Sequence, residues 1–219
     1  MEKTKSILFI TVIIALFFIT NKSFPQITDI DGNTYNTVKI GNQEWTAENL
    51  NVEHYRNGDV IPQVQDKAQW SELTTGAWCY YKNDSKNGKT YGKLYNWYAI
   101  HDSRGLAPEG WHIPSDAEWT KLTDFLGGKE VVGGKLKATI LWESPNTGAT
   151  NESGFSAFPG GVRGTSGGCS LIGENGGFWG SSEYNNDGAL NRCLCHDGSD
   201  VYRVISLKGD GLSVRCVRD

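Results

Sequence analysis

Pro114-Ser-Asp-Ala-Glu-Trp119 is the stretch from which the fold prediction starts, because it begins the longest helix that the sequence predicts. Ser115 at the N-cap and Glu118 three residues later form a capping box, in which the two side chains satisfy backbone N–H groups of the first turn. Apolar residues then recur at helical spacing, and Gly127-Gly128 end the pattern. The apolar stripe consists of Trp119, Leu122, Phe125 and Leu126. We expect this stripe to pack against a core.

Upstream of this helix, residues 27–48 alternate β-prone segments with tight turns. Asp31-Gly32-Asn33 follows residues 27–30, and Gly41-Asn42 separates residues 34–40 from residues 43–48. Such turn residues between alternating segments are typical of hairpins. The sequence therefore predicts a small antiparallel meander at this end of the chain.

The first of these turns also resembles the beginning of a calcium loop. Asp29, Asp31 and Asn33 occupy the first three ligand positions of an EF-hand. The glycine is misplaced, and the twelfth position is Ile40 where the motif needs Glu. The turn interpretation is therefore favoured over calcium binding.

Other segments predict further short elements. We expect a short helix capped by Asp66, a strand over residues 77–81, and a short helix over residues 91–100. Residues 212–219 alternate apolar and polar side chains and predict a final strand. Paired glycines are dense from Gly127 onward, which predicts long irregular loops.

Composition narrows the class of protein. The 219 residues include 27 Gly and 8 Trp, and the formal net charge is −4. Abundant aromatic residues and few prolines are typical of a folded chain. A negative balance argues against nucleic acid as a partner, since nucleic-acid binding needs a basic surface. No segment after the first residues is apolar enough to cross a membrane.

The first 26 residues predict a secretory signal. Lys3 and Lys5 precede the uncharged apolar run of residues 7–20, which is short for a membrane span of roughly 20 apolar residues. The small residues typical of a cleavage site are missing, so an uncleaved N-terminal anchor is the alternative. We expect an exported protein, in the periplasm, at the cell surface or secreted.

Five cysteines are present: Cys79, Cys169, Cys193, Cys195 and Cys216. In an oxidising compartment, up to two disulfides and one remaining thiol are expected. A direct bridge between Cys193 and Cys195 would be strained, because side chains two apart on a strand point to the same face. The spacing does not fit a zinc site, which needs further ligands.

Seven ordered motifs resemble a known family. They are Val38-Lys-Ile-Gly-Asn-Gln-Glu-Trp-Thr-Ala-Glu-Asn-Leu50, His54-Tyr-Arg-Asn-Gly-Asp59, Tyr91-Gly-Lys-Leu-Tyr-Asn-Trp-Tyr-Ala99, Gly110-Trp-His-Ile-Pro-Ser-Asp-Ala-Glu-Trp119, Asn151-Glu-Ser-Gly-Phe-Ser-Ala157, Trp179-Gly-Ser-Ser-Glu-Tyr184 and Ser213-Val-Arg-Cys-Val-Arg-Asp219. Together they resemble the Fibrobacter succinogenes major paralogous domain, over residues 27–219.

The resemblance implies a fold more than an activity. The family is similar to C-type-lectin-like and formylglycine-generating-enzyme-like domains. It therefore implies an α+β fold with small twisted antiparallel sheets, two short helices and long Gly-rich loops. No catalytic residues are established for the family, so the resemblance supplies none. Recognition of a glycan or of a surface protein is an expectation from fold analogy.

The cysteines depart from the family pattern. Relatives have Cys-Pro-x-Gly-Trp where this chain has Ala107 before Pro108. If that cysteine pairs with the last strand in relatives, Cys216 has no equivalent partner in this chain. Cys193 and Cys195 are additional, and a bridge from Cys169 to one of them is an alternative.

The leading functional hypothesis is a non-catalytic binding module. Exposed Trp side chains stack on sugars, while carboxylates and amides bond hydroxyl groups or hold Ca²⁺. The candidate ligand-binding residues are Trp179, Glu183, Asn185, Asp187, Asp197 and Asp200, with the last two on a nearby turn. The alternative is that Trp179 belongs to the core and that the acids are solvated. No cofactor other than Ca²⁺ is expected.

Two enzymatic alternatives are weaker, and one non-enzymatic alternative fits the sequence equally well. Cys195 and the residues around it resemble part of a copper oxidase site, but that site needs a second thiol at the position of Asp200. A hydrolase would need a G-x-S-x-G element, which Ser181 and Ser182 do not supply. A structural or protein-interaction module of the cell surface fits the sequence as well as a glycan-binding module does.

Overall fold

The computed structural model describes residues 25–219. Residues 1–24 of the predicted signal therefore lie outside the described part. The strands are β1 (Gln26–Thr28), β2 (Thr34–Ile40), β3 (Gln43–Thr46), β4 (Trp78–Cys79), β5 (Leu94–Tyr95), β6 (Trp111–His112), β7 (Gly160–Arg163), β8 (Cys169–Ile172), β9 (Asn175–Glu183), β10 (Gly188–Cys195), β11 (Tyr202–Leu207) and β12 (Val217–Arg218). The helices are α1 (Lys67–Ser71), the 3-10 turn η1 (Tyr81–Asn83), α2 (Ser85–Tyr91), α3 (Trp97–Ile100), α4 (Asp116–Phe125) and α5 (Val132–Leu136).

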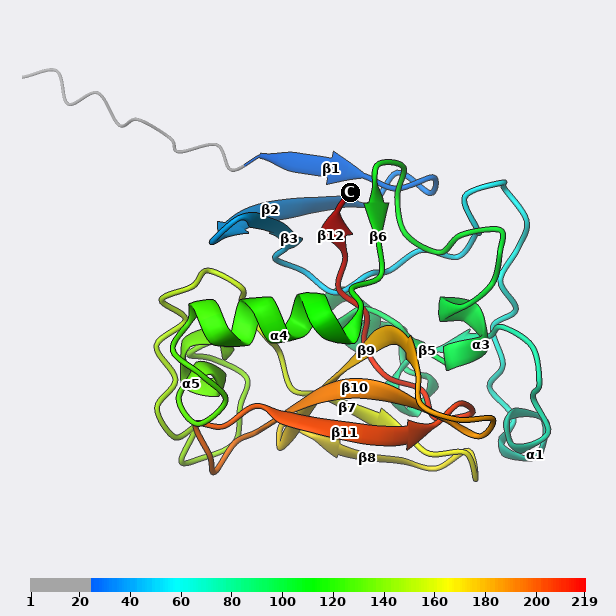
Figure 1. Cartoon of the computed structure of the whole chain (residues 1–219). Helices are drawn as coiled ribbons and strands as arrows, with labels where there is room; N and C mark the ends of the chain where they lie inside the picture. Colours follow the sequence, from blue (N-terminus) through cyan, green and yellow to red (C-terminus); the bar gives the residue numbers. More distant parts are fainter. Residues whose placement is uncertain (1–24) are drawn as a thin grey trace, which may run out of the picture.

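Two five-stranded sheets form the frame, and the α+β prediction is confirmed (Figure 1). One sheet has the order β1-β2-β3-β12-β6 and the other the order β11-β10-β9-β7-β8. Nearly all strand pairs are antiparallel, but β7 pairs with β9 in parallel. This parallel pair departs from the expected antiparallel pairing because the chain leaves β7 through the β8 hairpin before β9 joins the other side of β7.

The predicted meander is confirmed as β1, β2 and β3. Val38 lies opposite Trp45 in the β2–β3 hairpin. Asp29 organises the first turn, since its Oδ1 accepts the backbone N–H groups of Asp31 and Asn33 at 2.9 Å each. Its carboxylate is therefore used within the turn, as the turn interpretation predicts. β12 then inserts between β3 and β6 as an interior strand of this sheet.

α4 has the predicted capping box. Ser115 Oγ accepts the N–H of Glu118, and Glu118 Oε2 accepts the N–H of Ser115 at 2.8 Å. Trp119 and Leu122 are fully buried, but Phe125 is 64 % exposed, so its prediction as a core residue is wrong. Phe125 is the last residue of α4, and its ring covers Gly41, where a Cβ would come within 3.0 Å of it.

The other predicted elements have mixed outcomes. α1 is confirmed, with Asp66 as its N-cap. A single helix over residues 91–100 is wrong, because α2 ends at Tyr91, β5 occupies the middle of the range and α3 begins only at Trp97. Leu94 pairs with Cys79 of β4, so strand pairing overrides the helical spacing there. The predicted last strand shortens to β12, with bridges at Leu212 and Ser213.

Helices are short but more numerous than the two implied by the resemblance. Five α-helices occur in residues 25–219, and α4 is the longest with 10 residues. α5 was not predicted because its Gly133-Gly134 pair is a poor helix former. The pair is needed for packing, since a Cβ on Gly133 would lie 2.2 Å from the main-chain oxygen of Asp200.

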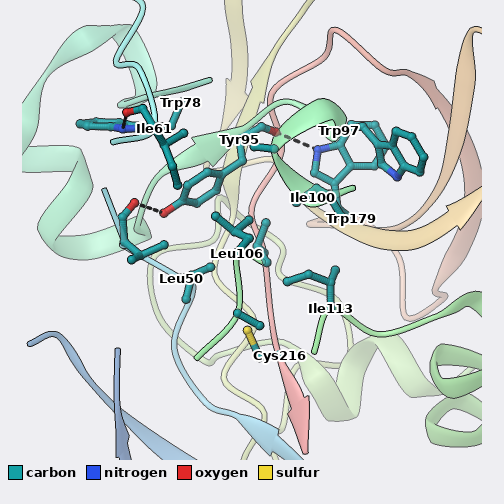
Figure 2. Close-up of a cluster of buried hydrophobic side chains, with 14 of the residues drawn as sticks. Leu50, Ile61, Trp78, Tyr95, Trp97, Ile100, Leu106, Ile113, Trp179 and Cys216 are labelled. Carbon is teal, nitrogen blue, oxygen red and sulfur yellow. Dashed lines mark hydrogen bonds between the residues drawn. The ribbon is translucent and has the colours of Figure 1, made fainter. Parts of the chain in front are cut away.

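Aromatic side chains fill the core. One cluster contains Tyr95, Trp97 and Trp179 (Figure 2). A second lies between α4 and the strands beside it. Trp179 is 0 % exposed, and its Nε1 donates to the main-chain oxygen of Tyr95 at 2.8 Å. The buried indole of Trp179 thus combines a large apolar surface with a satisfied donor.

Buried basic side chains fix the loops onto this core, and we call them the buried cations. They are Lys93, Lys137, Arg163, Arg192, Lys208 and Arg215. Arg215 donates to the main-chain oxygens of Thr46, Phe155 and Ser156 at 2.7–2.9 Å. Its guanidinium lies 4.5 Å from the Phe155 ring centroid, which adds a cation–π contact. Three segments far apart in the sequence are therefore joined at one side chain.

Candidate functional site

A groove of about 350 Å³ is lined by residues of α1, α3 and the β9–β10 turn. These elements lie at the right side of Figure 1. We call it the β9–β10 groove. Its lining residues are Trp70, Ser71, Glu72, Leu73, Thr74, Tyr98, Thr165, Asp187, Leu207, Lys208 and Gly209. This volume is within the range of small-molecule sites. The groove draws its side chains from five separate segments.

The β9–β10 turn gives Asp187 its position at the rim. Asn185 Oδ1 accepts the N–H groups of Asp187 and Gly188 at 3.0 and 2.8 Å, which is the usual way an Asn fixes a turn. Asp187 itself is exposed. The carboxylate of Asp187 is thereby held at the groove by a turn that uses the neighbouring amide.

Lys208 connects the turn to the floor of the groove. It is only 8 % exposed, and its N–H donates to the main-chain oxygen of Asp187 at 2.9 Å. Its Nζ lies 2.5 Å from Glu183 Oε1 and 4.9 Å from the Trp97 ring centroid. The hydrogen bond from Lys208 lowers the pKa of Glu183, so this carboxyl stays ionised. Lys208 and Glu183 form an ion pair beside the groove, and their charges cancel.

Aromatic rings form the apolar part of the groove. Tyr98 is half-buried and lines it directly. Trp70 is buried, and its Nε1 donates to the main-chain oxygen of Gly209 at 2.9 Å. Beside the groove, the exposed His101 ring stacks on Trp97 at a centroid distance of 4.6 Å. The groove therefore presents an aromatic surface next to carboxylates, hydroxyl groups and an amine.

The structure separates the six predicted ligand-binding residues. Glu183, Asn185 and Asp187 come together at the β9–β10 turn, while Trp179 is a core residue, as the alternative interpretation holds. Asp197 and Asp200 lie in the turn between β10 and β11, at the other end of the hairpin.

The expectation that Asp197 and Asp200 lie near the other acids is therefore wrong. The β10–β11 ladder runs from the Gly188–Leu207 pair to the Cys193–Tyr202 pair, a strand length of about 17 Å. β10 extends without a reversal between the two turns, so acids at its two ends cannot meet.

The sequence does not indicate that several of the groove residues belong to the site. Lys208 lies 21 residues after Asp187 in the sequence and reaches it only because β10 and β11 form a hairpin. Tyr98 has the spacing of a helix that packs on the core, and its half exposure depends on where α3 ends. Thr165 arrives from the β7–β8 turn.

A larger groove of about 440 Å³ lies between β2 and α2, but several of its polar groups already have partners. Glu48 accepts from Asn36, at its backbone and its side chain, and Asn49 bonds Tyr91 and Arg215. Asn51 accepts from Lys93. The β9–β10 groove retains more free polar groups and is the better candidate.

All five cysteines are free thiols, so the predicted disulfides are not formed. Cys169 packs against the cluster that contains Cys79. A bridge from Cys169 to Cys193 or Cys195 does not fit, since β8 and β10 are separated by β7 and β9, about 14 Å across the sheet. Cys216 is fully buried in the same cluster as Ala107.

Cys193 and Cys195 have thiols that contact each other on one face of β10. Burial raises the pKa of Cys193 to about 12 and also raises that of Cys195. Thiols with raised pKa values remain protonated and are weak nucleophiles at neutral pH. Their environment therefore lends no support to the oxidase hypothesis.

His112 joins β6, α4 and the C-terminal residue. Its Nε2 lies 2.8 Å from Glu118 Oε1, and its Nδ1 lies 2.6 Å from Asp219 Oδ1. Burial lowers the pKa of His112, but the bonds to Asp219 and Glu118 outweigh burial and raise it above 6.5. The imidazolium is thus favoured in the folded state.

This arrangement predicts a pH dependence of stability. The folded-state pKa of His112 is raised, so the ion pairs of His112 add fully to the free energy of unfolding below pH 6.5. This stabilisation is lost as the pH rises through the folded-state pKa. The side chain is 40 % exposed, so we expect less than about 1 kcal/mol. Urea unfolding of wild type and His112→Gln should differ more at pH 6 than at pH 9. An equal difference at both pH values would contradict the assignment.

No group of three or more His, Cys, Asp or Glu side chains in residues 25–219 is arranged to hold a metal ion. Within the same residues, no helix has the length and apolar character needed to cross a bilayer.

Comparison with known proteins identifies a family. The model of the Fibrobacter succinogenes major domain matches residues 38–218. No curated protein and no solved structure matches the chain significantly.

Proposed function

The chain belongs to the Fibrobacter succinogenes major domain family, and from that premise we propose that it is an exported, non-catalytic module that binds a glycan in the β9–β10 groove. The N-terminal basic and apolar segments support export. A C-type-lectin-like relationship is part of the proposal and rests on the seven motifs. The proposal assigns no reaction to the groove.

One observation carries the glycan assignment: an aromatic ring and several hydrogen-bonding groups share a single open groove. Tyr98 offers an apolar ring face to the C–H groups of a sugar. The carboxylates of Glu72 and Asp187 accept hydrogen bonds from sugar hydroxyls, and the hydroxyl groups of Thr74 and Thr165 both donate and accept. Ser71 Oγ donates to the main-chain oxygen of Ala68 and is left to accept. Such a combination of apolar and polar lining is typical of small-molecule sites.

A glycan array probed with the full chain, with and without EDTA, tests this function. We expect binding to a limited set of glycans. Loss of binding in EDTA would assign Ca²⁺ to the site, where Glu72 and Asp187 are the lining carboxylates. A blank array in both conditions would contradict glycan binding.

Asp187 and Asp197 form a matched pair for a mutational test. Asp187→Asn should weaken binding of an array-selected glycan about tenfold or more, because a charge-assisted hydrogen bond contributes about 1.5–3 kcal/mol. Asp197→Asn should leave the affinity unchanged, since Asp197 lies at the other end of β10. Calorimetric titration measures both. Equal affinities for wild type and Asp187→Asn would remove Asp187 from the site.

A protein-interaction role is the second candidate, and the edge strand β11 favours it. β11 is the outer strand of its sheet, and Tyr202, Val204, Ile205 and Leu207 are 36–51 % exposed. Exposed apolar edge strands pair readily with strands of other chains. Ile205→Lys would abolish partner binding by this strand while leaving glycan binding intact, so the two functions are separable.

A further inference from the structure

Lys93 is a buried lysine whose amine lies between an amide and a carboxylate. Its side chain is 2 % exposed, and it immediately precedes β5. Nζ lies 3.1 Å from Asn51 Oδ1 and 2.5 Å from the main-chain oxygen of Asn51. The Glu53 carboxylate is 3.3 Å from the same nitrogen. An amine, a carboxamide and a proton carrier therefore meet at one point.

Burial of Lys93 makes its amine easier to deprotonate. It lowers the pKa of Lys93, even though the Glu53 carboxylate acts in the opposite direction. The Trp78 and Tyr80 rings, whose centroids lie 4.5 and 5.3 Å from Nζ, also favour the charged form and only partly offset burial. A larger fraction of the amine is thus unprotonated than for an exposed lysine, and only the unprotonated amine is a nucleophile.

The two segments are held rigidly against each other. The N–H of Lys93 donates to the main-chain oxygen of Leu50 at 3.2 Å, and the N–H of Asn51 bonds the Tyr35 hydroxyl at 3.0 Å. Tyr95 Oη donates to the main-chain oxygen of Val52 at 2.7 Å, and Figure 2 shows Tyr95 beside Leu50 and Trp78. Fixing reactants at contact distance removes much of the entropic barrier to their reaction.

We propose that Lys93 and Asn51 form an intramolecular isopeptide bond, with Glu53 carrying the proton. The lone pair of the neutral Nζ attacks Cγ of Asn51, and a C–N bond forms. The Glu53 carboxylate takes a proton from Nζ and gives it to Nδ2. The Cγ–Nδ2 bond then breaks, the carbonyl re-forms, and ammonia leaves. Nothing is oxidised or reduced, and no other reactant is consumed.

The other buried lysines lack this arrangement. Lys137 Nζ bonds the main-chain oxygens of Cys195 and Gly198, and main-chain amides offer no ammonia leaving group. Lys208 has the Glu183 carboxylate but no side-chain amide among its hydrogen-bond partners. Lys137 therefore provides a matched internal control.

High-resolution mass spectrometry of the purified full chain tests the proposal without any variant. We expect a loss of one ammonia, about 17 Da, together with a branched tryptic peptide in which Lys93 is joined to Asn51. Lys93→Arg and Glu53→Gln should each restore the full mass, while Lys137→Arg should keep the loss. Tandem sequencing is essential, because cyclisation of an N-terminal Gln releases the same mass. Separate, unmodified peptides carrying Asn51 and Lys93 in the folded chain would overturn the proposal.

Discussion

Arg215→Met should lower the free energy of unfolding by about 4 kcal/mol, because several buried oxygens lose a charged donor at once. Arg215 is 0 % exposed, and besides three main-chain oxygens it bonds Asn49 Oδ1 at 2.6 Å. Met fills a similar volume, so the loss reports on the hydrogen bonds and the cation–π contact rather than on a cavity. Urea unfolding followed by tryptophan fluorescence measures the change.

Arg218 supplies the control from the same motif. Its side chain is 64 % exposed, and its partner Glu44 is 23 % exposed. Arg218→Met should change the free energy of unfolding by less than about 0.5 kcal/mol. If Arg215→Met is as stable as Arg218→Met, the hydrogen bonds of Arg215 do not stabilise the loops on the core.

Trp179→Ala should cost about 4 kcal/mol, the usual effect of removing a fully buried indole. The substitution leaves a cavity in the cluster of Tyr95 and Trp97 and removes the donor to the oxygen of Tyr95. This result would establish Trp179 as a core residue rather than a ring that stacks on a ligand. Urea unfolding provides the stability, and a glycan titration below the transition provides the affinity.

Tyr184 is the matched control, since it lies five residues later and is 56 % exposed. Tyr184→Ala should leave stability within about 0.5 kcal/mol of wild type. Near-wild-type stability of Trp179→Ala combined with a loss of glycan binding would contradict the burial of Trp179 and restore the ligand-stacking interpretation.

The parts of the fold that the sequence predicts correctly are those fixed by neighbouring residues. The capping box of Ser115 and Glu118 and the turns of the meander depend on a few consecutive side chains. The helix expected over residues 91–100 fails because Leu94 pairs with Cys79, and such a pairing is not encoded in the local spacing. Phe125 fails for a similar reason: Gly41, which its ring covers, is remote in the sequence.

The sequence predicts the part of the candidate site that lies in a single turn, but not the residues that other segments bring to it. Glu183, Asn185 and Asp187 come together because they belong to one turn, which alternation and turn residues indicate. Lys208 and Tyr98 need the hairpin register and the position of α3, which only the folded chain defines. The buried cations are even harder to predict from the sequence, because basic residues usually occupy exposed positions.

The measurement that tests the account most directly is chemical-shift mapping on the ¹⁵N-labelled full chain, titrated with the glycan that binds best on the array. Binding in the β9–β10 groove predicts shifts of amides in residues 70–74, at Tyr98, Thr165 and Asp187, and in residues 207–209. The turn that contains Asp197 and Asp200 should remain unchanged. Shifts concentrated there, or in the groove between β2 and α2, would contradict the assignment of the site.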